Sequence, residues 1–283
     1  ATNIPLYHRS VKTVWADIDR KTLCIDPEDV KKKITKRTKA IVQVHLGGIQ
    51  AEVHEKLGNL FNAWLGKHIP IVSDACQALG IFIGDYTCNS FQAIKHITTG
   101  DGGMLVLNNK EDYIRAKKKR WFGIDREHKA RNNWQASTGR LMTCDIEEAG
   151  HKRHMNDIAA SMGIEALKEY DNIIAHRKKI FNIYKEGFKK ISGIRLVDGD
   201  VNTYWLATVI VEQRDNLLQK LFEADIDTNV VQLRNDILTI FGGKRQDLPV
   251  MNELEFKYFS IPVGMNVSIE DAMYIVNIIR SGW

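Results

Sequence analysis

The sequence lacks the features that mark several classes of protein. Its 283 residues contain only four cysteines, Cys24, Cys76, Cys88 and Cys144, with no CxxC pair and no regular spacing. This pattern argues against a metal site or a disulfide framework and favours buried thiols. No run approaches the ~18 consecutive apolar residues that a membrane helix needs, and the first ten residues lack a signal-peptide layout. We therefore expect a soluble, cytoplasmic protein with no membrane partner.

The chain also has little excess charge of one sign. The formal net charge is +5, and the basic clusters at 31–33 and 117–120 are short. Such clusters more often form solvated helix faces than nucleic-acid patches, so we expect no nucleic-acid partner. Anionic small molecules remain candidate ligands. The hydrophobic content of 44% is that of a globular protein with a substantial core.

The first half alternates short apolar runs with amphipathic helical stretches, which indicates βαβ units and a mostly parallel sheet. Strands are expected at 11–19, 39–46, 69–75 and 102–109, and helices at 26–34 and 51–66. Asp26 before Pro27 is the expected cap of the first of these helices, and Asp29 would complete an approximate capping box.

The second half has a different pattern. Residues 154–191 repeat apolar side chains at helical spacing, and a closing helix is expected from about Ser268. Strands are expected at 203–212 and 227–233, with a helix at 216–225. We therefore expect an α/β fold with a large domain over 1–153, followed by a linking helix and a smaller α+β domain over 154–283.

Lys95 lies in the segment SFQAIKHITTGDGG, residues 90–103, after an apolar run and before closely spaced glycines. Taken alone, such a lysine is usually a surface residue whose stem covers apolar area. A lysine amine captures a carbonyl only if part of it is neutral, which requires desolvation or a cationic neighbour. Asp74 ends a predicted buried strand, where ligands of open α/β sheets collect, although a helix-capping role would also explain it.

Taken together, these residues describe a pocket for pyridoxal 5′-phosphate. The ligand would need a buried acid for its cationic ring, a lysine for its aldehyde, and a hydroxyl with glycine-rich backbone for its phosphate. Asp74, Lys95 and Ser90 supply the three side chains. The stretch from Thr98 to Gly103 would then be a turn whose backbone passes close to the cofactor lysine.

These segments resemble the DegT/DnrJ/EryC1/StrS family of sugar aminotransferases, in the fold-type I class of pyridoxal phosphate enzymes. The resemblance covers nearly the whole chain, and its most specific parts are SDACQALG at 73–80 and SFQAIKHITTGDGG at 90–103. GHKRHMNDIAAS and VVQLRND also match. The resemblance implies a mostly parallel sheet flanked by helices and a smaller C-terminal domain.

The resemblance also implies roles for single residues. Lys95 would bind the cofactor aldehyde and later carry protons, while Asp74 would pair with the pyridinium nitrogen. Gln77 would lie against the ring near its 3′-oxygen, and Ser90 would hold the phosphate. His154 would reach the cofactor phosphate of a neighbouring subunit, which implies a homodimer with shared sites. An ordinary residue at a helix start is the alternative for His154.

Arg234 and Asn235 resemble residues at the mouth of the sugar-nucleotide pocket, where Arg234 could hold a diphosphate as a fork. A surface turn is the alternative. The sequence departs from the family pattern at a few positions that bear on the substrate more than on the cofactor: Asn89, His151, Arg153 and Gln232.

The residues of these motifs most resemble those of the perosamine- and viosamine-forming branch. We therefore expect ping-pong transamination of a nucleotide-diphospho-4-keto-6-deoxyhexose with glutamate as the amino donor. A C3-specific enzyme and a cofactor-binding regulatory or inactive homologue stay open, as does a coincidental motif in an unrelated α/β domain. The dehydratase branch carries a histidine in place of the lysine, and Lys95 argues against it.

The family's chains normally begin well before the segment that matches ATNIP, and the sequence does not start with Met. The preceding part would include a glycine-threonine turn for the cofactor phosphate. We therefore expect an N-terminally incomplete chain with exposed apolar surface and an unpaired sheet edge, whose activity in isolation is an open question.

Overall fold

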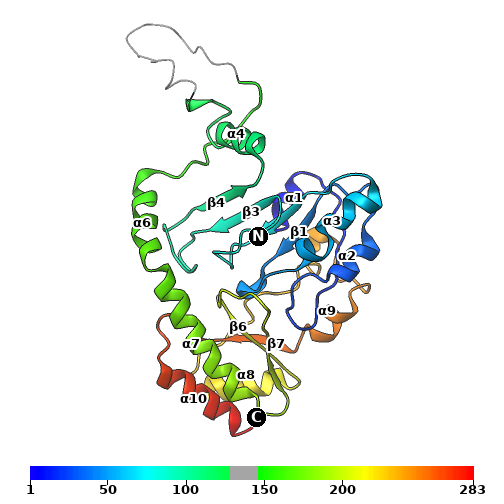
Figure 1. Ribbon diagram of the computed structural model, residues 1–283. Helices are drawn as coiled ribbons and strands as arrows, with labels where there is room; N and C mark the ends of the chain where they lie inside the picture. The colour runs from blue at the N-terminus through cyan, green and yellow to red at the C-terminus, as the bar shows by residue number, and fades with distance from the viewer. Residues whose placement is uncertain (128–145) are drawn as a thin grey trace.

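The computed structural model describes residues 1–127 and 146–283, without the side chains of residues 59, 62 and 63. The described elements form two sheets, one of four strands and one of three, and two successive helices connect them (Figure 1). The N-terminus lies beside the first sheet, and the C-terminus lies at the opposite end of the molecule (Figure 1). In the described ranges, no helix is long and apolar enough to cross a membrane.

The first sheet has the predicted, mostly parallel arrangement. Its strand order is β1 (Ile41–Val44), β2 (Ile71–Asp74), β3 (Tyr86–Ser90) and β4 (Gly103–Leu107). β1, β2 and β3 are parallel, while β4 is antiparallel to β3 and forms an edge. Asp74 pairs in register with Val44 on one side and Cys88 on the other. The carboxyl ends of β2 and β3 therefore meet at one edge of the sheet.

One face of this sheet is closed by two helices. Helix α2 (Pro27–Lys33) and helix α3 (Val53–Leu65) pack Val30, Val53, Leu57 and Phe61 against Ile41 and Ile71. The Asp26 carboxylate accepts a hydrogen bond from the Glu28 amide, as expected of an N-cap. The expected capping box does not form, because the Asp29 carboxylate accepts the Asp17 amide instead, at 2.7 Å.

Two expected strands are wrong. Residues 11–19 follow the short helix α1 (Ile4–His8) and form only an isolated bridge, Ile18 to Ile25. Val11 and Val14 are exposed there, so the alternation of side chains has no neighbouring strand to pair with. Residues 227–233 likewise make one bridge, from Asn229 to Ser260.

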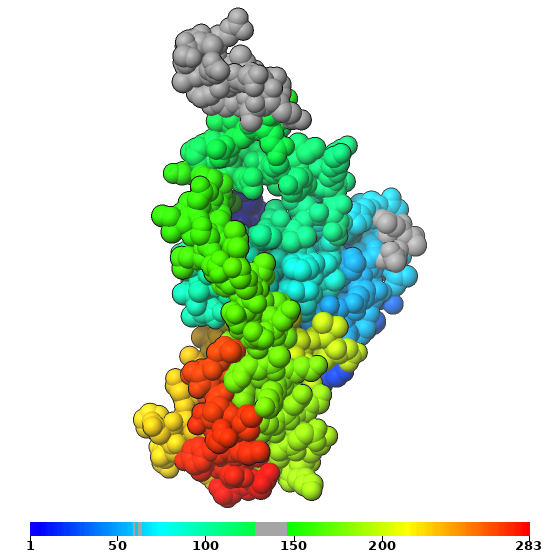
Figure 2. Space-filling view, turned by 60° about the vertical axis from the view of Figure 1, so that its left-hand side comes forward, coloured from blue at the N-terminus to red at the C-terminus, as the bar shows by residue number. Residues whose placement is uncertain are grey.

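The expected helix at 154–191 is confirmed as two helices, α6 (Asp157–Lys168) and α7 (Tyr170–Phe188), which meet at Glu169. The side chain of Asn156 accepts the Ala159 amide and caps α6. None of the α6 side chains is buried, and the helix lies on the outside of the molecule (Figure 2).

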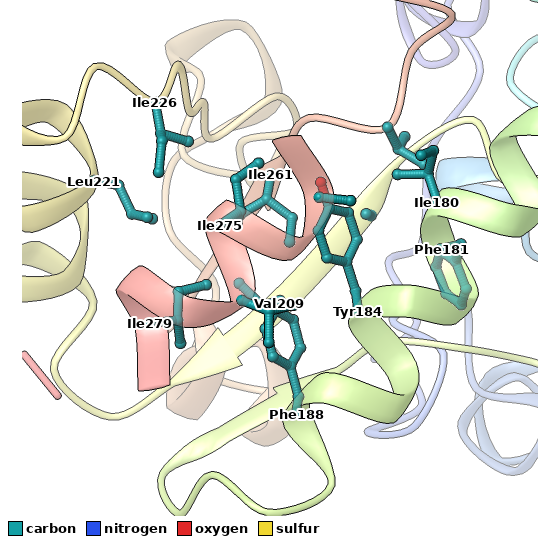
Figure 3. Packing of buried hydrophobic residues seen from close by; sticks show 14 of the residues in the cluster. Ile180, Phe181, Tyr184, Phe188, Val209, Leu221, Ile226, Ile261, Ile275 and Ile279 are labelled. Atoms are coloured by element: carbon teal, nitrogen blue, oxygen red, sulfur yellow. The ribbon is translucent and has the colours of Figure 1, made fainter. Parts of the chain in front are cut away.

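The second sheet carries the largest core. β5 (Ile194–Leu196), β6 (Ala207–Val211) and β7 (Tyr258–Ile261) are antiparallel and pack on α7, α8 (Arg214–Glu223) and α10 (Ile269–Arg280). Figure 3 shows side chains of α7 and α10 meeting those of the sheet, with Tyr184, Val209 and Ile275 among them. Ser268 and Asp271 form a capping box, so the closing helix begins as predicted.

Several elements were absent from the sequence expectations: α4 (Lys110–Lys119), α9 (Pro249–Leu254), β3, β5 and β7. A third apolar cluster joins Leu23 and Ile49 to Val197 and Leu254, across the predicted domain boundary. The boundary at residue 153 therefore stays a prediction. Among the cysteines, Cys24 is buried, Cys76 and Cys88 are half-buried and free, and Cys144 lies outside the described residues.

Candidate active site

Asp74 and Lys95 lie at the same end of the first sheet. Asp74 is the last residue of β2, and Lys95 lies in the turns that follow β3. The two side chains act on each other electrostatically. Burial lowers the pKa of the Lys95 amine below its ordinary value, and the nearby Cys76 and Asp74 oppose this with smaller effects. Burial therefore increases the neutral fraction of an amine that also interacts with the carboxylate.

Lys95 contacts an aromatic ring. Its Nζ atom lies 4.3 Å from the centroid of the Trp205 ring. Burial also lowers the pKa of the neighbouring His96 to about 4, so this imidazole is neutral near pH 7. His96 Nε2 donates to the Thr203 carbonyl at 2.8 Å. Lys95 itself is half-buried.

Both oxygens of the Asp74 carboxylate are held. Oδ1 accepts the Cys76 amide at 3.0 Å, and Oδ2 accepts the Thr2 hydroxyl at 2.5 Å. The residues after Asp74 form turns, so Asp74 caps no helix. A carboxylate fixed in this way from two directions is suited to pair with one cationic group of a ligand.

Gln77 is oriented by the backbone of a glycine pair. Its Oε1 atom accepts the Gly47 amide at 2.7 Å. Gly47 and Gly48 both have positive φ, and a Cβ atom at Gly48 would lie 2.7 Å from the hydroxyl oxygen of Thr203. Only glycine allows this close approach between the end of β1 and the segment around Thr203. The role of Gln77 at the cofactor's 3′-oxygen stays a prediction.

The glycine-rich turn after Lys95 is as tight as predicted. The Thr99 hydroxyl donates to the Asp101 carbonyl at 2.7 Å, and the Thr98 hydroxyl donates to the Phe91 carbonyl at 3.1 Å. Gly102 has φ near 140°, and a Cβ there would lie 2.8 Å from the Thr99 hydroxyl oxygen. Ser90, at the end of β3, lies close to this turn and accepts the Gln92 amide at 3.3 Å.

His154 lies two residues before the cap of α6. Its ring packs edge-on against Trp121 with the centroids 4.3 Å apart. Its Nδ1 atom is buried and has no hydrogen-bond partner among the described residues. The helix-start alternative does not explain this position, since Asn156 is the cap. The role of His154 at a neighbouring subunit's cofactor stays a prediction.

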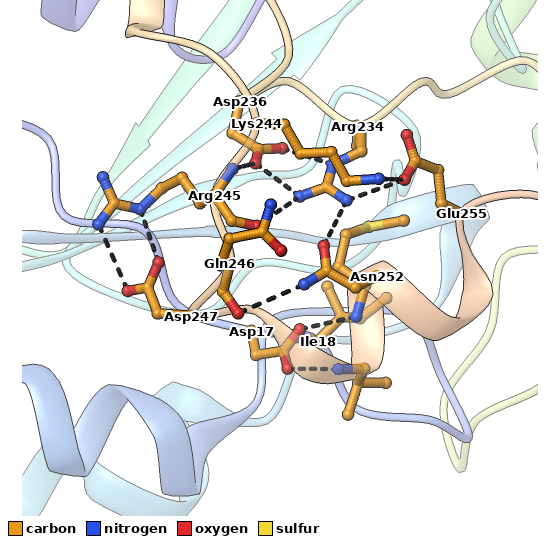
Figure 4. Close-up of polar contacts among 12 residues, drawn as sticks. Asp17, Ile18, Arg234, Asp236, Lys244, Arg245, Gln246, Asp247, Asn252 and Glu255 are labelled. Carbon is orange, nitrogen blue, oxygen red and sulfur yellow. Dashed lines mark hydrogen bonds and ion pairs between the residues drawn. The ribbon is translucent and has the colours of Figure 1, made fainter.

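Arg234 does not have the geometry that its predicted role needs. Its side chain is 1% exposed, and its guanidinium bonds to Asp236, Asn252, Glu255 and the Arg245 carbonyl (Figure 4). These bonds engage every guanidinium nitrogen, so no fork is left for a diphosphate. The surface-turn alternative is also wrong, because the side chain is buried. The neighbouring Asn235 is exposed, and its role at the substrate stays a prediction.

Sequence reasoning missed three residues that shape this site: Thr2, Trp205 and the Gly47 amide as the partner of Gln77. Thr2 and Trp205 reach the site across long stretches of chain, so no local pattern identifies them. The paired glycines after β1 were a usable signal, because two adjacent glycines at a strand end often mark a close approach of backbone.

The donor set fits pyridoxal 5′-phosphate. The site combines a desolvated amine, a carboxylate held at both oxygens, a serine hydroxyl and a glycine turn. In the part of the chain that the structure describes, no group of His, Cys, Asp and Glu could hold a metal ion. Figure 2 shows a hollow between α6 and the first sheet, with the blue N-terminal residues at its floor.

Comparison with known proteins agrees with this chemistry. The model of the DegT/DnrJ/EryC1/StrS aminotransferase family matches residues 1–280. GDP-perosamine synthase of Escherichia coli O157:H7 is 27% identical over 276 residues, which are 93% of this chain and 70% of that protein. The crystal structure of sugar aminotransferase CalS13 from Micromonospora echinospora superposes with a TM-score of 0.89 at 28% identity, covering 100% of this chain and 78% of CalS13.

A third similar protein bears on the cofactor. Spr1654 from Streptococcus pneumoniae is 25% identical in its PLP form, with a TM-score of 0.80, and the match covers 98% of this chain and 76% of Spr1654.

Proposed function

This chain belongs to the DegT/DnrJ/EryC1/StrS aminotransferase family, and from that membership and the Lys95–Asp74 site we propose the reaction that it catalyses. It is a sugar aminotransferase whose cofactor is pyridoxal 5′-phosphate. We propose that it converts a nucleotide-diphospho-4-keto-6-deoxyhexose to the 4-amino sugar, with glutamate as amino donor. The observation that carries the proposal is a desolvated Lys95 amine that senses the carboxylate of Asp74.

The residues around Lys95 would each hold a different part of the cofactor. Pyridoxal 5′-phosphate, when bound, supplies the electron sink that stabilises a carbanion next to nitrogen. Asp74 would hold the ring nitrogen, Gln77 the 3′-oxygen side of the ring, and Ser90 the phosphate. The glycine turn from Gly100 to Gly103 would bring backbone amides close to the same phosphate.

Lys95 would be the acid and base of both half-reactions. The amine of Lys95 would take the proton from the donor's α-carbon in the first half-reaction. It would give a proton to C4 of the sugar in the second, so one nitrogen would serve both substrates in turn, as ping-pong transamination requires. The lowered pKa of Lys95 increases the neutral fraction that can accept a proton. Acid and base work of this kind typically contributes ~10²- to 10⁴-fold.

Similarity to GDP-perosamine synthase supports the choice of C4 over C3, and the predicted resemblance supports glutamate as donor. The exposure of Asn235, beside the buried Arg234, supports a sugar-nucleotide site near the RND turn. In this proposal the buried Arg234 guanidinium fixes the RND turn through its hydrogen bonds, and the exposed Asn235 faces the substrate.

We also propose a cytoplasmic homodimer in which each site uses His154 of the other subunit. Two observations support the assembly. The Nδ1 atom of His154 is buried without a partner, and α6 carries large exposed apolar side chains, with Ile158 78% exposed, Ile164 62% and Leu167 58%. Large apolar side chains exposed on a surface helix are often covered at a subunit interface.

The test is a product assay. The chain is incubated with pyridoxal 5′-phosphate, glutamate and nucleotide-linked 4-keto and 3-keto sugars, and amino sugars are identified by mass spectrometry and NMR. We expect a 4-amino sugar, and no product with Lys95→Ala. A 3-amino product would replace the C4 assignment by the C3 alternative. Cofactor binding without any amino sugar would favour the regulatory or inactive homologue.

A further inference from the structure

The indole of Trp205 lies directly against the reactive amine. Lys95 Nζ is 4.3 Å from the centroid of the Trp205 ring, within the range of a cation–π contact. Trp205 comes from the segment that leads into β6 of the second sheet, whereas Lys95 follows β3 of the first. The proposed reaction assigns Trp205 no part, although a large aromatic face beside the amine must affect where that amine rests.

The ring is fixed relative to the turn that carries Lys95. Trp205 is 6% exposed, and its Nε1–H donates to the carbonyl of Ile94, the residue before Lys95, at 3.3 Å. The Trp205 carbonyl accepts Arg177 Nη1 on α7 at 3.2 Å. The indole is therefore held at both its ring nitrogen and its backbone. The distance to the amine follows from these anchors.

The backbone around Trp205 is docked on the glycine pair at the end of β1. The Thr203 amide donates to the Gly48 carbonyl at 2.9 Å, and the Leu206 amide donates to the Gly47 carbonyl at 2.9 Å. Between them Tyr204 has φ of 57°, a left-handed conformation that costs free energy for a bulky side chain. The fold thus tolerates a strained residue where it presents Trp205 to the site.

We propose that Trp205 is a positioning residue for Lys95. Its indole face holds the ε-ammonium in one place whenever the amine is not bonded to the cofactor. A contact of this type favours the seated position by a factor of roughly 2 to 30. That the Lys95 amine is repeatedly released from the cofactor rests on the proposed function, whereas the contact between Lys95 and Trp205 does not.

The contact with Trp205 holds the Lys95 amine away from the Asp74 carboxylate. The carboxylate acts electrostatically on the amine, yet the partners that its two oxygens bind are the Cys76 amide and the Thr2 hydroxyl. Without the indole, the free ammonium would be drawn toward the carboxylate, the group needed by the ligand's ring nitrogen. Trp205 therefore leaves Asp74 available and returns the amine to the same point in every cycle.

The first test is spectroscopic and needs no turnover. The full chain, free of cofactor, is labelled with ε-¹³C-lysine, and the Lys95 signal is identified by its loss in Lys95→Ala. We expect an upfield ring-current shift of the Lys95 ε-methylene, lost in Trp205→Leu and kept in direction in Trp205→Phe. Trp64→Leu, which removes an exposed indole on α3, is the matched control. An unshifted signal in the wild type, or the same shift in Trp205→Leu, would overturn the proposal.

The second test separates this inference from the proposed function. In the half-reaction with glutamate, Trp205→Leu should lower the rate about tenfold and raise the isotope effect of α-deuterated glutamate, with KM changed far less. Trp205→Phe should fall between Leu and wild type, and it carries the test if Trp205→Leu does not fold. If the wild type shows the shifted Lys95 signal but does not react with glutamate, the proposed function is wrong and this inference stands. If Trp205→Leu turns over at the normal rate, this inference is wrong and the proposed function stands.

Discussion

At the scale of single residues, the carboxylate of Asp74 depends on a partner from the far N-terminal end of the chain. The Thr2 hydroxyl donates to its Oδ2 atom at 2.5 Å, while the Cys76 amide donates to Oδ1 at 3.0 Å. Hydrogen bonds to charged groups contribute more than neutral ones, so Thr2 should help to orient Asp74 toward the cofactor's ring.

Thr2→Val is expected to weaken the binding of pyridoxal 5′-phosphate by about tenfold, because one oxygen of Asp74 loses its donor. Titration of the cofactor by absorbance measures the dissociation constant. Thr13→Val is the matched control, since Thr13 lies on the same N-terminal segment and does not bond to Asp74. Equal affinities for wild type and Thr2→Val would show that the Cys76 amide alone orients the carboxylate.

Arg234 is also a residue whose removal has a defined cost. Arg234→Met would leave Asp236 and Glu255 without their buried partner, and we expect a loss of about 3 to 5 kcal/mol in the free energy of unfolding. Denaturant unfolding at pH 7 measures it. Arg245→Met, which removes a more exposed partner of Asp247, is the control and should cost ~1 kcal/mol or less.

The same network predicts a pH dependence. Burial alone would raise the pKa of Asp236 and of Glu255, but hydrogen bonds from Arg234 to Asp236, and from Lys244 and Arg234 to Glu255, lower both overall. Their stabilisation is therefore complete above the ordinary carboxyl range and is lost as the pH falls through the lower folded-state values. In Arg234→Met this acid-side loss of stability should be smaller than in the wild type.

At the scale of elements, the two halves of the site meet where the end of β1 touches the segment before β6. Gly48 has φ of 99°, and a Cβ there would lie 2.9 Å from the Trp205 amide. The Gly48 carbonyl accepts the Thr203 amide at 2.9 Å. The glycine pair therefore helps to place the segment that carries Trp205.

Gly48→Ala should destabilise the protein by about 3 kcal/mol, of which roughly 1 comes from the left-handed backbone and the rest from the clash. Gly66→Ala is the control, because Gly66 also has positive φ but a Cβ there meets nothing within 4 Å. We expect about 1 kcal/mol for the control. Thermal or denaturant unfolding compares the two, and equal losses would mean that the backbone approach at Gly48 can relax.

An element could be predicted where the residues that cause it lie close together in the sequence. β1 and β2 were predicted because each is a short apolar run, and the residues that end the run follow it directly in the sequence. Residues 11–19 show the same type of run, but a strand forms only if another strand lies beside it, and here none does. The short strand β3, Tyr86–Ser90, was missed because its polar residues hide the pattern.

The site divides in the same way. Asp74 could be placed at the end of a strand from the sequence, because the apolar run before it is local, whereas the roles of Lys95, Asp74 and Ser90 stay predictions. Arg234 was given the wrong partner, since its acceptors Asp236 and Glu255 become buried with it only in the folded chain. Trp205 reaches Lys95 from 110 positions away in the sequence, so its role is visible only in three dimensions.

At the scale of the whole molecule, the proposed homodimer predicts complementation between two defective chains. Lys95→Ala and His154→Ala are each expected to be poorly active. In a mixed dimer with shared sites, one site carries both changes and the other carries neither. Mixing equal amounts should therefore recover up to about a quarter of the wild-type rate. No recovery, after exchange of subunits is shown by mass spectrometry, would place His154 in its own subunit's site.

The central claim is that the nitrogen of Lys95 carries the cofactor. The most direct measurement is reduction of the cofactor-loaded chain with borohydride, followed by digestion and mass spectrometry of the peptides. We expect one modified position, Lys95, with the mass of reduced pyridoxal phosphate added, and no modification in Lys95→Ala. Labelling of a different lysine, or of none in a chain that binds the cofactor, would contradict it.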